Sequence, residues 1–498
     1  MNIVVLGGGY VGLVNAAVLA EQGHRVRVVE SAPAKLRALQ SGECPVYEPG
    51  LQEALLASAS AIEYSGSVAR ETLSQTDMAM LCVGTPSRED GSANLDALFQ
   101  AVKSLRGMRK ESVVAVKSTV PPGTCERVEE ALRLGSVGCP VVHLPEFLAQ
   151  GSALENARNP ARIVLGTHRG RGRELVRSLY APRPVIEMGR REAELCKQAC
   201  NAYLAVRLSF FNEMANLCES MGLDYRAVAR GIGSDPRIGR EYMRAGCGYG
   251  GSCLPKDSRA LLREAACEGM RLELVDAAQR VNEAQKRRML QMAHRYFRSL
   301  EGMRVAVLGL AFKAGTDDLR CAPSLEVISE LLREGAEVDI WDRAAKYPRR
   351  QDGQWRQCAT VEEALQDADG YNAVLIDVKS PLGNFYYSTD IADAQTADAD
   401  ISACDALIRE LTETPDLIVV ARVPAFSDPN FVAKHYSSAL TTTSGDLWMD
   451  ERRCYWLRPD SIDAQSYLAA IALELDSLGF DEVLFDNFYV PSDSSIAW

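Results

Sequence analysis

The chain contains 498 residues, more than one ordinary hydrophobic core can organise, so two or three domains are expected. Its hydrophobic share of 47% is typical of globular protein, and its net charge of −12 comes without the basic runs of a nucleic-acid-binding protein. No apolar stretch approaches the roughly 20 residues that a membrane-spanning helix needs. We therefore expect neither a nucleic acid nor a membrane as partner.

Fourteen cysteines are scattered along the chain without the regular spacing of a disulfide framework. Residues 1–9 carry no charged leader and pass directly from an apolar run into a glycine-rich turn, which is unlike a secretion signal. Reduced thiols in a cytoplasmic protein are therefore expected.

The first thirty residues predict a strand at Asn2–Leu6, a helix at Tyr10–Gln22 and a second strand at Arg25–Glu30. Further strands are predicted at Met78–Val83, Ser112–Lys117, Val141–Leu144 and Arg162–Leu165. The alternation of strands with helical segments predicts a parallel, doubly wound sheet.

The loop between the first strand and the first helix has the G-x-G-x-x-G spacing, formed by Gly7, Gly9 and Gly12. The three glycines would permit a tight turn, close approach of a pyrophosphate, and close packing of helix on strand. Glu30 ends the next strand, where a carboxylate accepts hydrogen bonds from an adenosine ribose and disfavours a 2′-phosphate. These features favour NAD as cofactor, with a structural glycine-rich turn as the alternative.

Two long helical segments follow, at about Arg191–Ser220 and Glu273–Phe297. Long helices between two α/β units often form a spine and a dimer contact, so a homodimer is expected. A second α/β unit begins with the apolar run at residues 303–310, and another strand is predicted at Glu337–Trp341.

The most informative segment is residues 248–257, in which glycines precede Cys253, and Lys256 and Asp257 follow it. Glycines allow a substrate to approach the backbone, and a nearby cation lowers the pKa of a thiol, which makes the thiolate available as a nucleophile. Cys253 is therefore predicted to be a nucleophile with a lowered pKa. The alternative is a buried inert cysteine, the usual state of free cysteines.

Eight motifs occur in one order along residues 1–345. They are Gly7-x-Gly-Tyr-Val-Gly-Leu, Cys82-Val-Gly-Thr-Pro, Lys117-Ser-Thr-Val-Pro-x-Gly-Thr, Pro145-Glu-Phe-Leu, Lys197-x3-Asn201, Asp235-Pro-Arg-Ile-Gly, Gly-Gly-Ser-Cys253-x-Pro-Lys-Asp and Phe312-Lys-x-Gly-Thr-Asp-Asp-x-Arg320. In content and order this set resembles the UDP-glucose/GDP-mannose dehydrogenase family. The resemblance implies oxidation of a nucleotide sugar's CH2OH group to a carboxylate in two hydride transfers to NAD.

The resemblance also implies the catalytic residues. Cys253 would add to the aldehyde intermediate, Lys197 and Asn201 would stabilise oxyanions from one helix face, and Thr119 would hold a water. Asp257 would position the hydrolytic water, and Glu146 would be the acid and base of thioester hydrolysis. Read without the family pattern, Lys197 and Asn201 could form an exposed helix face, and the two acids could be surface or capping residues.

Binding residues follow from the same resemblance. The implied cofactor contacts are Gly7, Gly9, Tyr10, Val11, Gly12, Glu30, Lys35, Thr85, Thr119 and Arg320. The implied substrate contacts are Glu146, Phe147, Leu148, Lys197, Asn201, Arg237, Tyr242, Gly250 and Lys313, with Arg237 reaching across a dimer interface. Asp317 and Asp318 are expected to order their loop, with plain surface acids as the alternative. No metal site is expected.

Two positions depart from the family pattern. Leu144 stands where the family has Asn, and Gln150 stands where it has a second Glu. Because an amide cannot act as a base, any role of that second acid is lost or taken elsewhere. The motifs favour UDP-glucose as substrate and leave GDP-mannose as the alternative.

Beyond about residue 370 the family's ending is not recognisable, and the segment resembles a glycoside-hydrolase-like barrel family. Asp377 and Asp486 would be its candidate acid pair. Strands are predicted at Ala373–Val378, Leu417–Val423 and Glu482–Phe485. A closed barrel needs eight strands, so the alternative is that this segment completes the second α/β sheet.

The predicted architecture is α/β: an N-terminal Rossmann NAD-binding domain (1–190), a central helical dimerisation domain (191–298), and a second Rossmann-like nucleotide-sugar-binding domain (299–498) that is atypical from about 370. Two other functions stay open. A 2-hydroxy acid or 6-phosphogluconate type dehydrogenase would leave the Cys253 segment without a role. A non-catalytic nucleotide-sugar binder, or a fusion with a carbohydrate-active module, would explain Leu144, Gln150 and the unusual ending.

Overall fold

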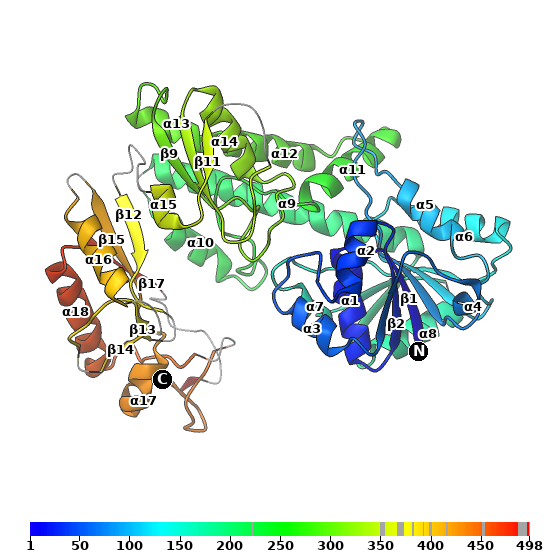
Figure 1. The fold of residues 1–498 in the computed structure, drawn as a ribbon, viewed down its shortest axis with the longest axis horizontal. Coiled ribbons are helices and arrows are strands. Elements are labelled where there is room, and N and C mark those ends of the chain that lie inside the picture. The colour runs from blue at the N-terminus through cyan, green and yellow to red at the C-terminus, as the bar shows by residue number, and fades with distance from the viewer. Residues whose placement is uncertain are drawn as a thin grey trace. The chain divides into compact units, whose positions relative to one another are not determined.

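A computed structural model describes residues 1–498 except 169, 222, 349–353, 366–372, 381–382, 392, 398–400, 415–416, 451–453, 487–495 and 498. The chain forms two compact units, residues 1–368 and residues 369–498, which are described separately (Figure 1). The finer division of the first unit at 190/191 and 298/299 stays a prediction. Within the described residues, no helix combines the length and the apolar character needed to cross a membrane.

The first unit begins with an eight-stranded sheet in the order β3-β2-β1-β4-β5-β6-β7-β8. Its strands are β1 (Asn2–Leu6), β2 (Arg25–Val29), β3 (Ile62–Ser65), β4 (Met78–Leu81), β5 (Val113–Val116), β6 (Val141–His143), β7 (Ile163–Gly166) and β8 (Val185–Met188). All neighbours are parallel except β6 and β7. The order of β3 to β6 is the doubly wound arrangement that binds dinucleotides at its switch point, which confirms the predicted fold class.

Helices cover both faces of this sheet, as Figure 1 shows for the blue to cyan part of the chain. The helices of this domain are α1 (Tyr10–Glu21), α2 (Pro33–Gln40), α3 (Leu51–Ala57), α4 (Arg70–Leu73), α5 (Asp96–Lys103), α6 (Thr124–Leu134), α7 (Ala153–Arg158) and α8 (Arg171–Tyr180). On β1, Ile3 and Val5 pack with α1, α3, α7 and α8, whereas Val4 and Leu6 pack with α4, α5 and α6. A strand buried on both faces explains the uninterrupted apolar run at the N-terminus.

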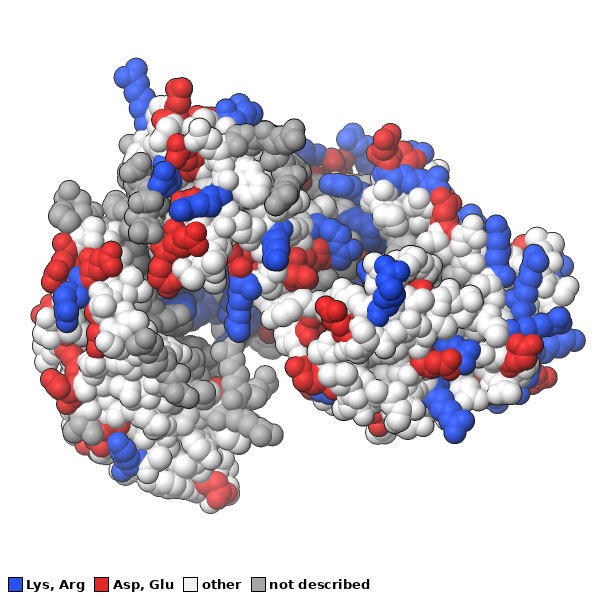
Figure 2. All heavy atoms as spheres, viewed as in Figure 1, with Lys and Arg blue, Asp and Glu red and all other residues white. Residues whose placement is uncertain are grey.

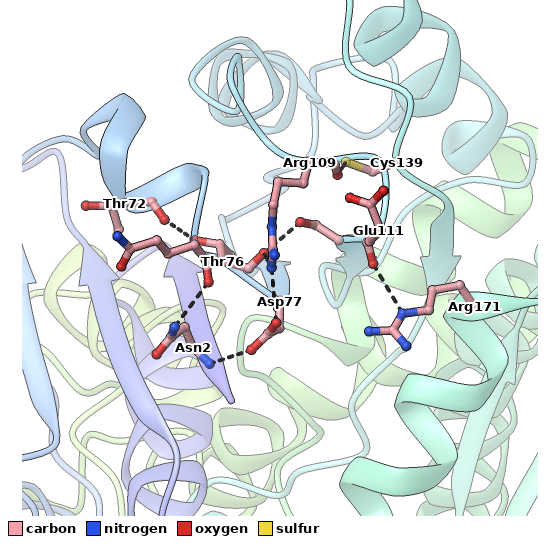
Figure 3. Close-up of polar contacts among 10 residues, drawn as sticks. Asn2, Thr72, Thr76, Asp77, Arg109, Glu111, Cys139 and Arg171 are labelled. Carbon is pink, nitrogen blue, oxygen red and sulfur yellow. Dashed lines mark hydrogen bonds and ion pairs between the residues drawn. The ribbon is translucent and has the colours of Figure 1, made fainter.

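Polar contacts join the amino-terminal ends of the strands, at the edge opposite the cofactor loop (Figure 3). The Asn2 backbone N–H donates to Asp77, and Arg109 pairs with the same carboxylate at 3.3 Å. The Cys139 thiol donates to the Arg109 carbonyl. These contacts fix the sheet edge without entering the predicted site.

The centre of the first unit is built on the predicted long helix, which runs as α9 (Arg190–Ser220) and is packed by α10 (Tyr225–Gly233) and α11 (Leu254–Cys267). The second predicted long helix is wrong as a single element. It is two helices, α12 (Glu273–Lys286) and α13 (Arg288–Tyr296). The Arg287 N–H bonds the Ala284 carbonyl, three residues back, so the last turn of α12 tightens and the helix breaks.

The first unit ends in a three-stranded parallel sheet, ordered β11-β10-β9, with β9 (Arg304–Leu308), β10 (Glu337–Trp341) and β11 (Trp355–Gln357). Helices α14 (Pro323–Arg333) and α15 (Val361–Leu365) belong to this layer. Ile328, Leu331, Val338 and Ile340 form its buried core. The loop from β9 to α14, residues 309–322, carries the charged motif predicted to meet the substrate.

The second unit has its own parallel sheet, ordered β12-β15-β17, made of β12 (Ala373–Asp377), β15 (Ile418–Pro424) and β17 (Glu482–Asp486). Because the described strands of this sheet pair only with one another, the alternative that they complete the preceding sheet is wrong. Short pairs β13 (Asn384–Phe385) with β14 (Gln395–Thr396) and β16 (Thr441–Thr442) with β18 (Ile496–Ala497) accompany it. Its helices are α16 (Ile401–Thr412), α17 (Pro429–Lys434), η1 (Tyr436–Ser438) and α18 (Ile462–Ser477).

Asp377 and Asp486 are the last residues of the two outer strands β12 and β17. In a parallel sheet these ends lie at one edge, as the barrel resemblance requires. The side chains of both aspartates lie outside the described residues. Three described parallel strands do not make a barrel, so the acid-pair hypothesis stays a prediction.

Candidate active site

The cofactor loop joins the end of β1 to the start of α1. A side chain at Gly12 would place its Cβ 1.9 Å from the Gly7 carbonyl oxygen, so only glycine allows α1 to pack this closely on the turn. Around Gly9, the residue before α1, no atom of the described residues lies within 4 Å of the position that a Cβ would take. Open space beside a helix N-terminus suits a pyrophosphate, and the loop therefore fits the dinucleotide that the sequence predicts.

Glu30 is buried one residue beyond β2. Its carboxylate accepts hydrogen bonds from the backbone N–H groups of Gly8 (3.0 Å) and Ala32 (2.7 Å). These bonds fix the carboxylate at the glycine loop, and each oxygen keeps a lone pair for a ribose hydroxyl. Lys35 lies exposed on α2, five residues after Glu30, and its cofactor contact stays a prediction.

Cys253 immediately precedes α11, and the residue is exposed, which contradicts the burial assumed in the alternative; its role as a nucleophile stays a prediction. The preceding loop lies close to the segment after Arg320. A Cβ at Gly250 would come within 2.2 Å of the Cys321 carbonyl oxygen, and the Gly251 N–H donates to the Arg320 carbonyl at 2.8 Å. The glycine at 250 is therefore required by contact with protein backbone, which brings the cysteine and the charged 313–320 loop together.

A buried polar cluster lies beside Cys253. Asp257, in the first turn of α11, is 1% exposed and accepts hydrogen bonds from Asn201 (2.5 Å) and Lys256 (2.6 Å). Lys256 also donates to Thr85 (3.3 Å), whose hydroxyl donates to the carbonyl of Thr119 (2.8 Å). This chain of contacts connects the cysteine helix, the long helix α9 and the carboxyl ends of β4 and β5.

A second pair comes from α9 and the loop after β6. The Lys197 ammonium is buried, 3.9 Å from a Glu146 oxygen and 4.9 Å from the centre of the Phe147 ring. The other Glu146 oxygen accepts from the Leu148 N–H at 2.6 Å. Lys197 and Asn201 are both buried, so the alternative of an exposed helix face is wrong, and the burial of Asp257 excludes a surface acid.

The predicted lowering of the Cys253 pKa is wrong, since protein atoms around the thiol raise its pKa by excluding water, even though the residue as a whole is exposed. The negative charges of Asp257 and Glu146 raise the pKa further. Lys197 lowers it, but Lys256, the cation predicted from sequence, is paired with Asp257. The thiol is therefore held mostly protonated until a substrate or a proton acceptor alters this balance.

The 313–320 loop supplies the predicted cations. Loss of hydration lowers the pKa of Lys313, whose charge is felt at Cys253 and Glu48. Arg320 is paired with Asp318 at 2.6 Å, so the expectation that this acid orders its loop is confirmed. Gln150 donates to the same carboxylate at 3.1 Å. A Glu at position 150 would instead place a negative charge against Asp318.

Tyr242 and Arg237 occupy the loop between α10 and α11. Tyr242 has a φ of 59°, an unusual backbone conformation for a side chain of this size, and interacts electrostatically with Lys197. The Arg237 side chain is 87% exposed, and among the described residues it pairs with Asp235 in its own loop. The described contacts therefore connect Tyr242 with Lys197, whereas those of Arg237 stay within its own loop.

Sequence reasoning missed Glu48, and it missed that Lys256 joins Asp257 to Thr85. The buried Glu48 carboxylate accepts from the Tyr10 hydroxyl (2.6 Å) and from the N–H groups of Gly151 (2.7 Å) and Ala153 (2.6 Å). It thus ties the cofactor helix to the loop that follows Glu146. No periodicity or motif distinguishes it from a surface acid, because its partners are remote in sequence.

Three consecutive segments match the UDP-glucose/GDP-mannose dehydrogenase family. Residues 1–183 match its NAD binding domain, residues 191–284 its central domain and residues 306–380 its UDP binding domain. Residues 354–497 match a family described as "Putative glycosyl hydrolase domain". The predicted departure from the usual ending beyond about 370 is therefore confirmed.

Curated relatives agree with these matches. A UDP-glucose 6-dehydrogenase from Pseudomonas aeruginosa is 44% identical over 369 residues, covering 70% of this chain and 81% of that protein. A UDP-glucose 6-dehydrogenase from Haloferax volcanii is 39% identical and covers 69% of this chain and 84% of that protein. The solved structure of a UDP-glucose dehydrogenase from Pyrobaculum islandicum is 38% identical with a TM-score of 0.70, over 75% of this chain and 89% of that chain.

Proposed function

The chain belongs to the UDP-glucose/GDP-mannose dehydrogenase family, and from that premise we propose that it oxidises the C6 alcohol of UDP-glucose to a carboxylate. The observation that carries the proposal is the convergence of an exposed Cys253 with buried Lys197, Asn201 and Asp257. A dehydrogenase that transfers one hydride has no use for such a nucleophile. NAD, when bound at the glycine loop and Glu30, accepts the hydride in each of two oxidations.

Cys253 makes the second oxidation possible, because a hydride can leave only from a tetrahedral carbon. In the proposed sequence the thiol sulfur bonds the aldehyde carbon, and the thiol proton passes to the carbonyl oxygen, which gives a thiohemiacetal. Loss of a hydride and a proton then leaves a thioester. Water attacks this thioester, the carbon–sulfur bond breaks, and the thiol is restored as the acid departs.

In the proposed mechanism Lys197 stabilises the oxyanions of these steps. Its buried ammonium supports this role, because any negative charge next to it is poorly screened by water. Asn201 donates a hydrogen bond to Asp257, which holds the amide in position for the same reacting oxygen. Glu146 has one oxygen fixed by the Leu148 N–H and the other facing Lys197, which suits an acid and base for hydrolysis. Gln150 adds no base, so hydrolysis in this proposal depends on Glu146 and Asp257.

The sugar and the reaction type are tested together by NADH yield. With UDP-glucose limiting, the full chain is expected to form two NADH per sugar, measured by absorbance against UDP-glucuronate quantified by chromatography. A parallel reaction with GDP-mannose is the control for nucleotide and sugar. One NADH per UDP-glucose would support a simple dehydrogenase, and binding of UDP-glucose without NADH would support a non-catalytic binder.

We also propose that the chain acts as a homodimer in a reducing, cytoplasmic setting, where the Cys253 thiol stays free. Tyr203, Phe210 and Leu217 are spaced two turns apart along α9 and are 62%, 47% and 50% exposed. An apolar row of this kind on a long helix suits a matching row on a second copy. A dimer would also give the exposed Arg237 a route to the partner's site.

Phe210→Glu is expected to weaken this dimer at least about thirty-fold, because a charge would replace a buried aromatic anchor. Light scattering during size-exclusion chromatography measures the change. Leu134→Glu, at an apolar residue on α6 that is 76% exposed, is the matched control and should leave the mass unchanged. A wild-type chain that elutes as a monomer at micromolar concentration would refute the dimer.

A further inference from the structure

Three potential metal ligands from separate elements meet inside the first unit. Cys125 lies in the first turn of α6, His143 ends β6, and Glu194 lies in the first turns of α9. All three side chains are fully buried, and one ligand atom of each lies within 4.8 Å of the others. Among the described residues, no other group of three or more His, Cys, Asp or Glu side chains meets this distance criterion.

Within the part of the chain that the structure describes, neither nitrogen of the His143 imidazole has a hydrogen-bond partner. Burial lowers the pKa of His143 to about 3, so the ring is neutral and one nitrogen carries a free lone pair. The neighbouring Val116 backbone interacts with the ring without hydrogen-bonding geometry. An orphaned buried nitrogen costs about 1–3 kcal/mol, and a bound cation is one way to satisfy it.

Glu194 and Cys125 complete the set with two groups that become anionic ligands when they bind a metal, and the Cys125 thiol hydrogen-bonds to the Glu194 carboxylate. The Glu194 oxygens accept from the N–H groups of Gly123 (2.6 Å) and Cys125 (2.7 Å), which orients the carboxylate and leaves lone pairs free. Burial and the adjacent carboxylate raise the pKa of the Cys125 thiol. Binding of a dication would displace the thiol proton, and the thiolate and the carboxylate together would balance the two positive charges.

We propose that Cys125, His143 and Glu194 form a structural site for a zinc-class transition-metal ion. Sulfur, imidazole nitrogen and carboxylate oxygen are the ligands that Zn²⁺ uses, whereas a thiolate disfavours Mg²⁺ and Ca²⁺. A tetrahedral ion with bonds of about 2.0–2.3 Å holds ligand atoms roughly 3.5 Å apart, so small side-chain movements close the site. The fourth position is left for a water or a hydroxide.

Such an ion would act through the elements it joins. From His143 the chain passes directly to Glu146, and one turn after Glu194 the helix α9 presents Lys197. An ion between them would fix the spacing of these two catalytic candidates without touching the substrate. This metal site takes no part in the proposed reaction, and its ligands are too far apart in the sequence to form a recognisable motif.

The test is the metal content of the full chain, expressed with added Zn²⁺ and purified without chelator. Mass spectrometry of the eluted ions is expected to find about one Zn²⁺ per chain. Expression with Co²⁺ should add a thiolate-to-cobalt absorption band, which reports sulfur ligation directly. Cys125→Ser should remove the band, and both Cys125→Ser and His143→Leu should lower the metal content at least about tenfold.

Two control variants separate this site from other thiols. Cys139→Ser removes another buried cysteine of the same domain, whose thiol donates to Arg109 (Figure 3). Cys196→Ser removes one of two neighbouring thiols on α9. Both controls should keep the metal and the band. A wild-type chain that binds less than about a tenth of an equivalent overturns the proposal even if the ligand variants fail to fold. Loss of metal in Cys196→Ser instead of Cys125→Ser overturns it as well.

Discussion

Cys253→Ser is expected to end the production of UDP-glucuronate and to leave a yield of at most one NADH per UDP-glucose. Without the thiolate no thioester can form, so the second oxidation should fall by on the order of 10⁴-fold or more, as when other nucleophiles are removed. Cys253 is exposed, and its thiol lies 3.6 Å from the Ser252 hydroxyl. We therefore expect a change in unfolding free energy within about 0.5 kcal/mol.

The matched control is Cys267→Ser, which replaces an exposed cysteine at the other end of α11. It should keep the yield of two NADH per sugar and the wild-type melting temperature. Full production of the acid by Cys253→Ser would refute the covalent mechanism. A fall in NADH yield in both variants would indicate oxidation or damage during handling.

The raised pKa of the Cys253 thiol gives this residue a predictable response to pH. Alkylation by iodoacetamide, followed by mass spectrometry of the Cys253 peptide, should accelerate as pH rises beyond the ordinary thiol range near 8.5. Asp257→Asn removes a negative charge that raises the pKa, so alkylation at a fixed pH near 8 should become faster. Lys197→Met removes the charge that lowers the pKa, so alkylation should become slower. The opposite order would mean that other charges control the thiol.

Lys197→Met is expected to lower kcat by about 10²–10³-fold with little change in KM. The buried ammonium stabilises the transition state most strongly, because negative charge develops on the reacting oxygen there. A donor in an oxyanion hole acts in the same way. Steady-state kinetics with UDP-glucose measures both constants. Arg191→Met, at an exposed residue on the same helix, should leave both unchanged.

The same substitution should destabilise the fold by about 1–3 kcal/mol, because the largely buried Glu146 would lose its cation. In the double variant Lys197→Met/Glu146→Gln, most of that stability should return, because no unpaired buried charge remains. The value of kcat should stay low, because the ammonium is still missing. Urea unfolding of the single and double variants measures the difference. Recovery of kcat in the double variant would contradict both the oxyanion role of Lys197 and the acid–base role of Glu146.

The sequence predicted the parts of this fold that depend on local patterns. The apolar run at β1, the glycine spacing before α1 and the helical period of α9 are properties of neighbouring residues, and the structure confirms all three elements. The break at Arg287 escaped prediction because one tightened turn hardly disturbs a hydrophobic period. The separate sheet of β12, β15 and β17 escaped because strand pairing is decided by residues far apart in the chain.

The sequence by itself determined the cofactor loop, the nucleophile segment and the family, because each is written in residues that are adjacent or ordered along the chain. Only the tertiary structure decided which charges lie next to the Cys253 thiol and which elements contact one another at the site. It paired Lys256 with Asp257, so the cation nearest to Cys253 in sequence is bound to a carboxylate, and burial raises the pKa of the thiol. It also brought Cys125, His143 and Glu194 together. Burial and Coulomb energies depend on distances through space and on the exclusion of water, and neither quantity exists until the chain is folded.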